Sequence, residues 1–202
     1  MRSEMYVPKQ FAVSERAELV RFIKAHPFGV LVSVSDAMPI ATHVPFVVLS
    51  EGEKIVLGLH VARANPHWQT LDGADVLAIF QGPHAFVSAS WYEKPERSVP
   101  TWDYSAVHCR GRASLADPAA TDRSLRALVA DHETAGAWSL DVVEPDYFEA
   151  MKLGIVAVEV VVSSMKGAFK HSQNRSDIER ERVAAELGAT EPELAAEIEA
   201  AG

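Results

Sequence analysis

The residues Leu59 to Trp68, LHVARANPHW, contain a change from strand to helix around which the rest of the chain can be interpreted. The apolar run from Ile55 to Leu59 predicts a strand. Asn65 is a favoured N-cap residue, and Pro66 suits the first helical position, where its missing N–H costs nothing. The next backbone amides would then lack intrahelical partners, and Arg63 would add a positive charge beside them. This pattern predicts a phosphate site, although a surface arginine next to an ordinary helix start is the alternative.

Length and composition indicate a soluble globular protein of one domain, or of one domain with an appendage. The chain has 202 residues, of which 48% are apolar and 23% charged. Its formal net charge of −9 argues against a broad surface for nucleic acid. The single cysteine, Cys109, cannot form an intrachain disulfide, which fits a reducing compartment. No apolar run approaches the ~20 residues of a membrane span. The first residues do not resemble a secretory signal, so we expect a cytoplasmic protein with no membrane partner.

The order of the predicted elements indicates an α+β fold with an antiparallel sheet. Short runs of strand length follow one another in meander order, with helices between and after them, and closure into a small barrel is compatible with this order. Gly82-Pro83 is expected to end one strand before the next begins. The strands are predicted at residues 28–35, 40–49, 54–59, 75–81, 84–88, 102–115 and 153–162. The helices are predicted at about 14–26, from Asn65-Pro66, from Asp117-Pro118 to about 133, at 145–152, and from a cap at Ser176 or Asn174 to about 187.

The end of the chain differs in composition from the rest. Residues 190–193, TEPE, have the form of a capping box and predict a last short helix rich in alanine and glutamate. We expect residues after Gly188 to be weakly packed. The predicted division is therefore a domain at residues 1–188 and a helical tail at residues 189–202.

No motif in the sequence assigns catalysis or a metal. The eight histidines lack the spacing of a zinc site, although a haem needs only one axial histidine. No Walker or Rossmann motif is present, and Cys109 is interpreted as a core residue rather than a nucleophile. Gln81, at a strand end, could pair with the edge of a heterocycle. A cluster of aromatic residues could contact a flat ligand, fill a dimer interface or belong to the core: Trp91, Tyr92, Trp102 and Tyr104.

Six short motifs, taken together, resemble one known family. They are residues 5–9 (MYVPK), 41–46 (ATHVPF), 60–66 (HVARANP), 80–84 (FQGPH), 99–104 (VPTWDY) and 172–175 (SQNR). In this order they resemble the FMN-binding negative transcriptional regulator family, the PaiB family, over residues 5–187. The chain departs from the family pattern at Asp103, where asparagine is expected.

The resemblance implies an antiparallel split β-barrel of the FMN-binding type, with peripheral helices and a C-terminal helical tail. It also implies a homodimer with FMN in the cleft between subunits, and it leaves DNA binding as a possible property. A flavin-dependent oxidoreductase, or a haem-binding or haem-degrading enzyme on the same barrel, is the alternative.

The same resemblance supplies the candidate cofactor residues. The turn at Arg63, Asn65 and Pro66 falls at the flavin phosphate, with His60 just before it. Thr42 and His43 would line the flavin edge, where Gln81 is also a candidate. Trp102 and Tyr104 would come from the partner subunit. Four further residues would close the pocket: Lys170, Ser172, Gln173 and Asn174.

Overall fold

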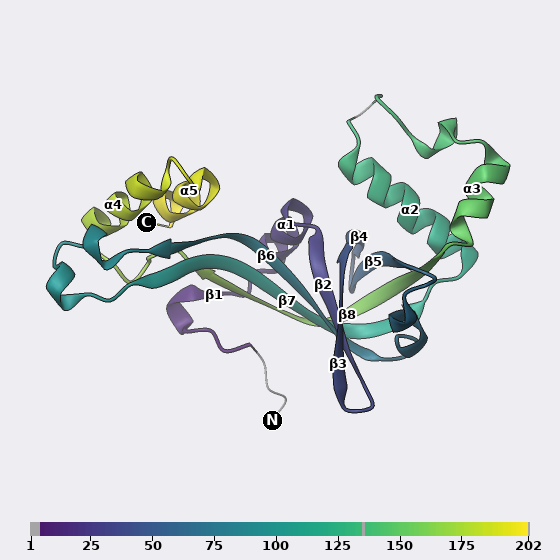
Figure 1. The fold of residues 1–202 in the computed structure, drawn as a ribbon, viewed down its shortest axis with the longest axis horizontal. Coiled ribbons are helices and arrows are strands. Elements are labelled where there is room, and N and C mark those ends of the chain that lie inside the picture. Colours follow the sequence, from purple (N-terminus) through teal and green to yellow (C-terminus); the bar gives the residue numbers. More distant parts are fainter. Residues whose placement is uncertain (1–4, 135, 202) are drawn as a thin grey trace. The chain divides into compact units, whose positions relative to one another are not determined.

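The computed structural model describes residues 5–134 and 136–201, which form one sheet and five α-helices (Figure 1). The strands follow the order β3-β2-β6-β7-β8-β5-β4, and β1 pairs with β8. The strand bounds are β1 (Ala12–Val13), β2 (Phe28–Ser35), β3 (Met38–Pro45), β4 (Val47–Glu51), β5 (Ile55–Ala62), β6 (Asp75–Val87), β7 (Thr101–Leu115) and β8 (Ile155–Lys170). The helices are α1 (Arg16–Ala25), α2 (Pro118–His132), α3 (Pro145–Lys152), α4 (Asp177–Leu187) and α5 (Pro192–Ala200). The α+β class predicted from the sequence is confirmed.

The chain forms two compact units, which are described separately. Unit 1 consists of residues up to 22, residues 81–107 and residues from 166, and unit 2 consists of residues 23–80 and 108–165. Strands β6, β7 and β8 each contribute residues to both units. Among the described residues, no helix is long and apolar enough to cross a membrane.

Unit 2 is built on antiparallel hairpins. Strands β2 and β3 pair from Phe28 opposite Pro45 to Ser35 opposite Met38, and the turn between them has positive φ angles at Asp36 and Ala37. Strands β4 and β5 form a second hairpin, and β5 pairs with β8. Alternate residues point into the core, as a half-buried strand requires. The core of this unit includes Leu31, Phe46, Leu57, Leu59, Phe80 and Val158.

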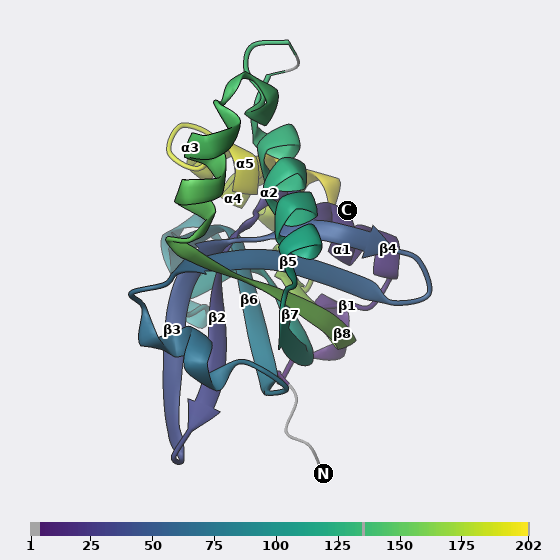
Figure 2. The ribbon, with the colours of Figure 1, turned by 90° about the vertical axis from the view of Figure 1, so that its right-hand side faces the viewer.

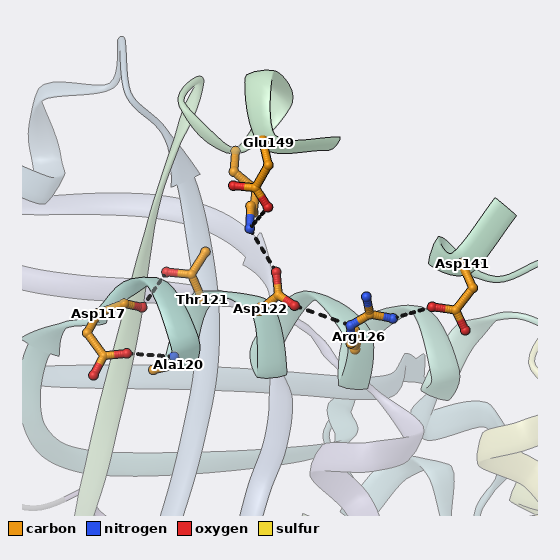
Figure 3. Close-up of polar contacts among 8 residues, drawn as sticks. Asp117, Ala120, Thr121, Asp122, Arg126, Asp141 and Glu149 are labelled. Carbon is orange, nitrogen blue, oxygen red and sulfur yellow. Dashed lines mark hydrogen bonds and ion pairs between the residues drawn. The ribbon is translucent and has the colours of Figure 1, made fainter. Parts of the chain in front are cut away.

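Helix α2 lies against the β4–β5 hairpin of unit 2 (Figure 2). Asp117 caps its start by accepting a hydrogen bond from the Ala120 amide at 2.7 Å. Ion pairs then join α2 to the segment that follows it, as Figure 3 shows around Asp122 and Arg126. Asp122 accepts from Lys152 of α3 at 2.9 Å, and Arg126 donates to Asp141 at 2.7 Å. Ion pairs that keep contact with water contribute little stability each, and only the pair with Lys152 links α2 to α3.

Unit 1 contains the C-terminal helices. Ser176, one of the two predicted caps, is the residue that caps α4, by accepting from the Glu179 amide. Helices α4 and α5 lie side by side beside β6 (Figure 1) and share one apolar cluster with it. The largest members of this cluster are Val87, Tyr92, Val183, Leu187, Leu194 and Ile198.

The expectation of a weakly packed tail was wrong. Leu194 and Ile198 of α5 are fully buried, because they lie one helical turn apart on the face that meets α4. The predicted capping box was also wrong, since the residue before α5 is Glu191 and it makes no side-chain cap.

Three strand boundaries also differ from the prediction. The predicted strand 40–49 is two strands, because Phe46 between them donates its N–H to the Pro27 carbonyl instead of the ladder. Strand β6 continues through Gly82-Pro83, since a proline is tolerated where its strand position needs no N–H for pairing. Strand β8 extends to Lys170, well beyond its apolar part. The helix predicted from Asn65-Pro66 is a single 3-10 turn, Pro66–Thr70.

Candidate functional site

The turn after β5 holds a buried histidine that the sequence analysis did not select. Asn65 caps the turn as predicted, with its Oδ1 accepting from the His67 amide at 3.0 Å. The His67 ring is buried, with Nδ1 2.7 Å from Thr42 Oγ1 and Nε2 2.9 Å from Ser33 Oγ. Asn65 Nδ2 also donates to Thr42 Oγ1 at 3.3 Å. The structure therefore brings Thr42 and Asn65 together through His67, which was missed because its partners come from β2 and β3.

Burial determines the charge of this histidine. Desolvation lowers the pKa of His67, which favours the neutral ring. A neutral imidazole has one donor and one acceptor nitrogen, and each can be satisfied by one of the two hydroxyl groups. His67 is therefore a rigid support beneath the turn rather than an exposed positive charge.

Arg63 is fixed by the backbone that precedes and begins β8. Its Nε donates to the Leu153 carbonyl at 2.7 Å, and its Nη2 donates to the Ile155 carbonyl at 2.9 Å. The backbone N–H of Arg63 donates to the Gly154 carbonyl at 2.8 Å. The guanidinium carbon also lies 5.9 Å from the ring centroid of Trp68, within the range of a cation–π contact. The side chain is exposed, yet the carbonyls of Leu153 and Ile155 hold it in one orientation.

A groove of about 280 Å³ lies beside this arginine within unit 2. Arg63 and Lys152 contribute positive charge to its wall, and Glu149 contributes negative charge. A guanidinium has five N–H donors, and the two carbonyl contacts of Arg63 use two of them. The arrangement can therefore present further donors from a charge whose position is already fixed.

The two strand histidines lie apart from the His67 group. His43 is exposed on β3 and neighbours Thr42, so the alternation of a strand directs it to the opposite face. His60 is half-buried on β5 opposite Ala157, and burial lowers its pKa. Thr42 of β3 therefore contacts Asn65 and His67 of the turn, whereas His43 does not join them.

Unit 1 carries an exposed aromatic face, defined here as His84, Phe86 and Trp102. The ring centroids of His84 and Trp102 are 6.3 Å apart, and those of Phe86 and Trp102 are 6.1 Å apart. Phe86 is 48% exposed and Trp102 is 55% exposed. Gln81 Nε2 lies 3.1 Å from His84 Nδ1, and the half-buried Tyr104 is two residues along β7 from Trp102.

The other two aromatic residues that the sequence analysis grouped with these have a different environment. Tyr92 is buried in the cluster beneath α4 and α5, and Trp91 packs against the same cluster. For them the core interpretation is correct. Arg175 stacks on Tyr92, with its guanidinium carbon 3.8 Å from the ring centroid.

Asp103 is a fully buried acid, not a turn residue. Its Oδ2 accepts from Ser172 Oγ at 2.6 Å, and Lys170 Nζ forms an ion pair with Oδ1 at 3.2 Å. Lys170 also donates to Thr101 Oγ1 at 2.6 Å and to the Trp102 carbonyl. Ser172 adopts a left-handed backbone conformation, with φ of 57°. The side chains of Lys170 and Ser172 therefore contact β7, whereas Asn174 is exposed.

The comparisons define the class of protein to which this fold belongs, a flavin-binding one. The family model described as "Putative FMN-binding domain" matches residues 5–164, and the chain belongs to this family. "Protease synthase and sporulation protein PAI 2" of Bacillus subtilis is 35% identical over 188 residues, which cover 91% of this chain and 89% of that protein. The PaiB-type resemblance predicted from the six motifs is confirmed.

Solved structures show the same fold at low identity. The flavocytochrome Anf3 from Azotobacter vinelandii has a TM-score of 0.64 and 17% identity, covering 82% of this chain and 72% of that chain. The FAD and heme binding protein from Mycobacterium smegmatis has a TM-score of 0.54 and 14% identity, covering 80% and 74%. The fold is accordingly an α+β split barrel, as predicted. Residues 165–202 lie outside the matched family model, and they include the segment from Lys170 to Asn174.

Proposed function

We propose that this protein binds FMN as a cytoplasmic homodimer of the PaiB type. The observation that carries the proposal is the fixed Arg63 beside the Asn65 turn, in a chain of the FMN-binding family. Bound FMN would supply electron or hydride transfer, and the chain's own residues would bind and orient it.

We assign the phosphate to the turn at Arg63, Asn65 and Pro66. Arginine is suited to phosphate because its planar N–H groups form charge-assisted hydrogen bonds. The carbonyl contacts hold this arginine before a ligand arrives, so little side-chain entropy remains to be lost on binding. Thr42 supports the turn through His67, and His60 precedes it on β5.

We assign the flavin ring to the aromatic face and its neighbours, with Trp102 and Tyr104 supplied by the partner subunit of the homodimer. Exposed aromatic rings offer a flat apolar surface on which an isoalloxazine ring can stack. Gln81 has an amide that can pair with the ring edge, and Tyr104 and His43 are further candidates on their strands. Aromatic residues are also enriched at protein interfaces, which supports the aromatic face as part of a homodimer. Lys170, Ser172, Gln173 and Asn174 would complete the pocket.

Titration with FMN, followed by absorption and by flavin fluorescence, tests the assignment. The purified chain is expected to take up one FMN per subunit, and its mass in solution should be that of a dimer. Arg63→Ala should weaken FMN binding by about ten- to a hundredfold, because one charge-assisted contact contributes ~1.5–3 kcal/mol. Arg112→Ala is the control, since Arg112 is an exposed arginine that pairs with Asp75. Equal FMN affinity in the two variants would remove Arg63 from the phosphate site.

Two other properties are decided by separate measurements. Hemin added to the flavin-free protein tests the haem alternative, for which a histidine-ligated absorption band would be required. The regulatory role follows from the PaiB resemblance, and the net charge of −9 gives it little electrostatic support. A complex with a specific DNA that survives moderate salt would support repression, whereas a complex lost at moderate salt would count against it.

A further inference from the structure

The last helix is joined to β7 and to the end of β8 by a buried polar group. Glu197 of α5 directs Oε2 to Ser105 Oγ at 2.7 Å and to His171 Nε2 at 2.9 Å. Ser105 Oγ and His171 Nε2 are themselves 2.7 Å apart. Ser105 is fully buried and His171 is nearly so, which leaves Glu197 as the partly exposed member. Side chains from β7, from the residue after β8 and from α5 therefore meet within hydrogen-bonding distance.

With Glu197 as a carboxylate, which can only accept, the hydrogens of this group can be assigned. The serine hydroxyl has one hydrogen, and it donates it to the Glu197 carboxylate. Ser105 Oγ can then only accept from His171, so Nε2 of the ring must carry a hydrogen. This is not the arrangement of a hydrolase, because serine and glutamate meet the same ring nitrogen and Ser105 is inaccessible. The contacts among Ser105, His171 and Glu197 therefore serve to fix these side chains relative to one another.

The segment held by His171 is a constrained turn. The His171 backbone N–H donates to Gln173 Oε1 at 2.7 Å, and Gln173 Nε2 donates to the Phe169 carbonyl at 2.7 Å. Between them, Ser172 has the left-handed conformation that residues with a side chain rarely adopt. Such a conformation persists only when the surroundings determine it. Two contacts hold this turn: Asp103 accepts a hydrogen bond from Ser172, and Glu197 pairs with the His171 ring.

We propose that Glu197 is a positioning residue for the flavin site. Through His171 it holds the turn that presents Gln173 and Asn174, and through Ser105 it holds the part of β7 that carries Trp102 and Tyr104. The inference rests on the proposed function, because these four residues are assigned there to FMN. It extends beyond the family match, since Glu197 and His171 both lie outside residues 5–164. The helix that no sequence motif explained thus has a role in binding.

Three full-length variants test this role. Glu197→Ala removes both contacts. Glu197→Gln keeps an oxygen that can accept from His171 and from Ser105, and it should therefore behave as a rescue. Glu199→Ala is the matched control, since Glu199 is exposed on the same helix. The amides of Leu194 and Ile198, measured by hydrogen exchange, report whether α5 stays folded in each variant.

Two readouts separate the inference from the proposed function. The first needs no ligand: amide exchange of residues 171–174, with the nitrogen-bound ring proton of His171 observed by NMR. In Glu197→Ala the turn should exchange at least tenfold faster and the ring proton signal should be lost, while Glu197→Gln and Glu199→Ala keep both. The second is FMN titration, where Glu197→Ala should bind about tenfold more weakly and Glu197→Gln within about threefold of the unchanged chain.

The outcomes are distinguishable. Unchanged exchange of the turn in Glu197→Ala, with α5 intact, would overturn the positioning role. Faster exchange of the turn with unchanged FMN affinity would show that Glu197 holds the turn but that the turn does not serve FMN, which also overturns the proposal. If the unchanged chain takes up no FMN, the proposed function fails and the flavin role of Glu197 fails with it. The exchange measurement still decides in that case whether Glu197 holds the turn.

Discussion

Replacing Lys170 with methionine should strongly destabilise this protein, because the buried Asp103 would lose the positive charge that pairs with it. Asp103 is fully buried, and its Oδ1 faces Lys170 Nζ at 3.2 Å. At that distance the attraction is about 5 kcal/mol with an effective dielectric constant of about 20, before desolvation is subtracted. Removing one partner of a buried pair typically costs ~3–5 kcal/mol, since the other charge stays buried. The Lys170 side chain is 18% exposed, so we expect a loss of stability at the lower end of this range, about 3 kcal/mol.

Urea unfolding followed by tryptophan fluorescence measures this loss. A cost of about 3 kcal/mol is a large fraction of the ~5–15 kcal/mol that stabilises a typical domain. Asp103→Asn removes the charge and keeps an acceptor for Ser172, so alone it should cost only about 1–2 kcal/mol. Combined with Lys170→Met, it should restore about 1–2 kcal/mol relative to Lys170→Met alone. Lys54→Met, at an exposed position, is the control and should change little.

The reasoning is refuted by either of two results. One is a loss below about 1 kcal/mol in Lys170→Met, which would mean that water or another group solvates Asp103. The other is strict additivity, in which the double variant is less stable than Lys170→Met by the full cost of Asp103→Asn. Additivity would show that the two residues do not interact in the folded chain.

Three further predictions concern unit 2. Burial lowers the pKa of His67, so the unfolded chain binds the proton more tightly than the folded chain does. The free energy of unfolding should therefore fall as the pH drops below about 6.5. Urea titrations at several pH values measure this dependence, and His67→Gln should make it weaker. Burial raises the pKa of the Cys109 thiol to about 12. A thiol reagent at pH 8 should therefore leave Cys109 unmodified in the native protein and label it in urea. Rapid labelling of the native protein would contradict its burial. A Cβ on Gly111 would lie 2.5 Å from the Val161 carbonyl oxygen, so Gly111→Ala should lower the free energy of unfolding in urea by about 1–3 kcal/mol. Gly52→Ala is the control and should leave it unchanged, because the nearest atom to a Cβ there is 3.6 Å away.

Local sequence signals predicted many elements correctly. Asp117 caps the helix that follows it and Asn65 caps its turn, as predicted, because a cap needs only neighbouring residues. For α4 the sequence left two candidates, of which Ser176 is the cap. The strand 28–35 was predicted at its observed bounds, and 102–115 within one residue of them. The same local rules failed at Gly82-Pro83, where they predicted a break. Pairing with neighbouring strands outweighs the preference of two residues, and β6 continues.

The candidate site was predicted less completely than the fold. Thr42, Asn65 and Pro66 were selected and do meet, but the residue that joins them is His67, whose other partner is Ser33. Nothing in the spacing of the chain indicates that residues 33, 42 and 67 converge, because convergence requires the hairpin and the turn to be folded. The buried face of α5 was missed for a related reason. Its alanine and glutamate content predicts solvation, and only the presence of α4 shows which side is covered.

The sequence by itself determined the family, the split-barrel class and the caps at Asp117 and Asn65, since these depend on motifs and on contacts between near neighbours. Only the tertiary structure decided which polar residues are paired. Ser172 reaches Asp103 across 69 residues of chain, and Glu197 reaches Ser105 across 92. A buried charge or hydroxyl must find a partner wherever the fold brings one within hydrogen-bonding distance, and that distance is not encoded in any local pattern. For this reason three of the residues expected to face a ligand at the end of β8 bind to their own chain: Lys170, Ser172 and Gln173.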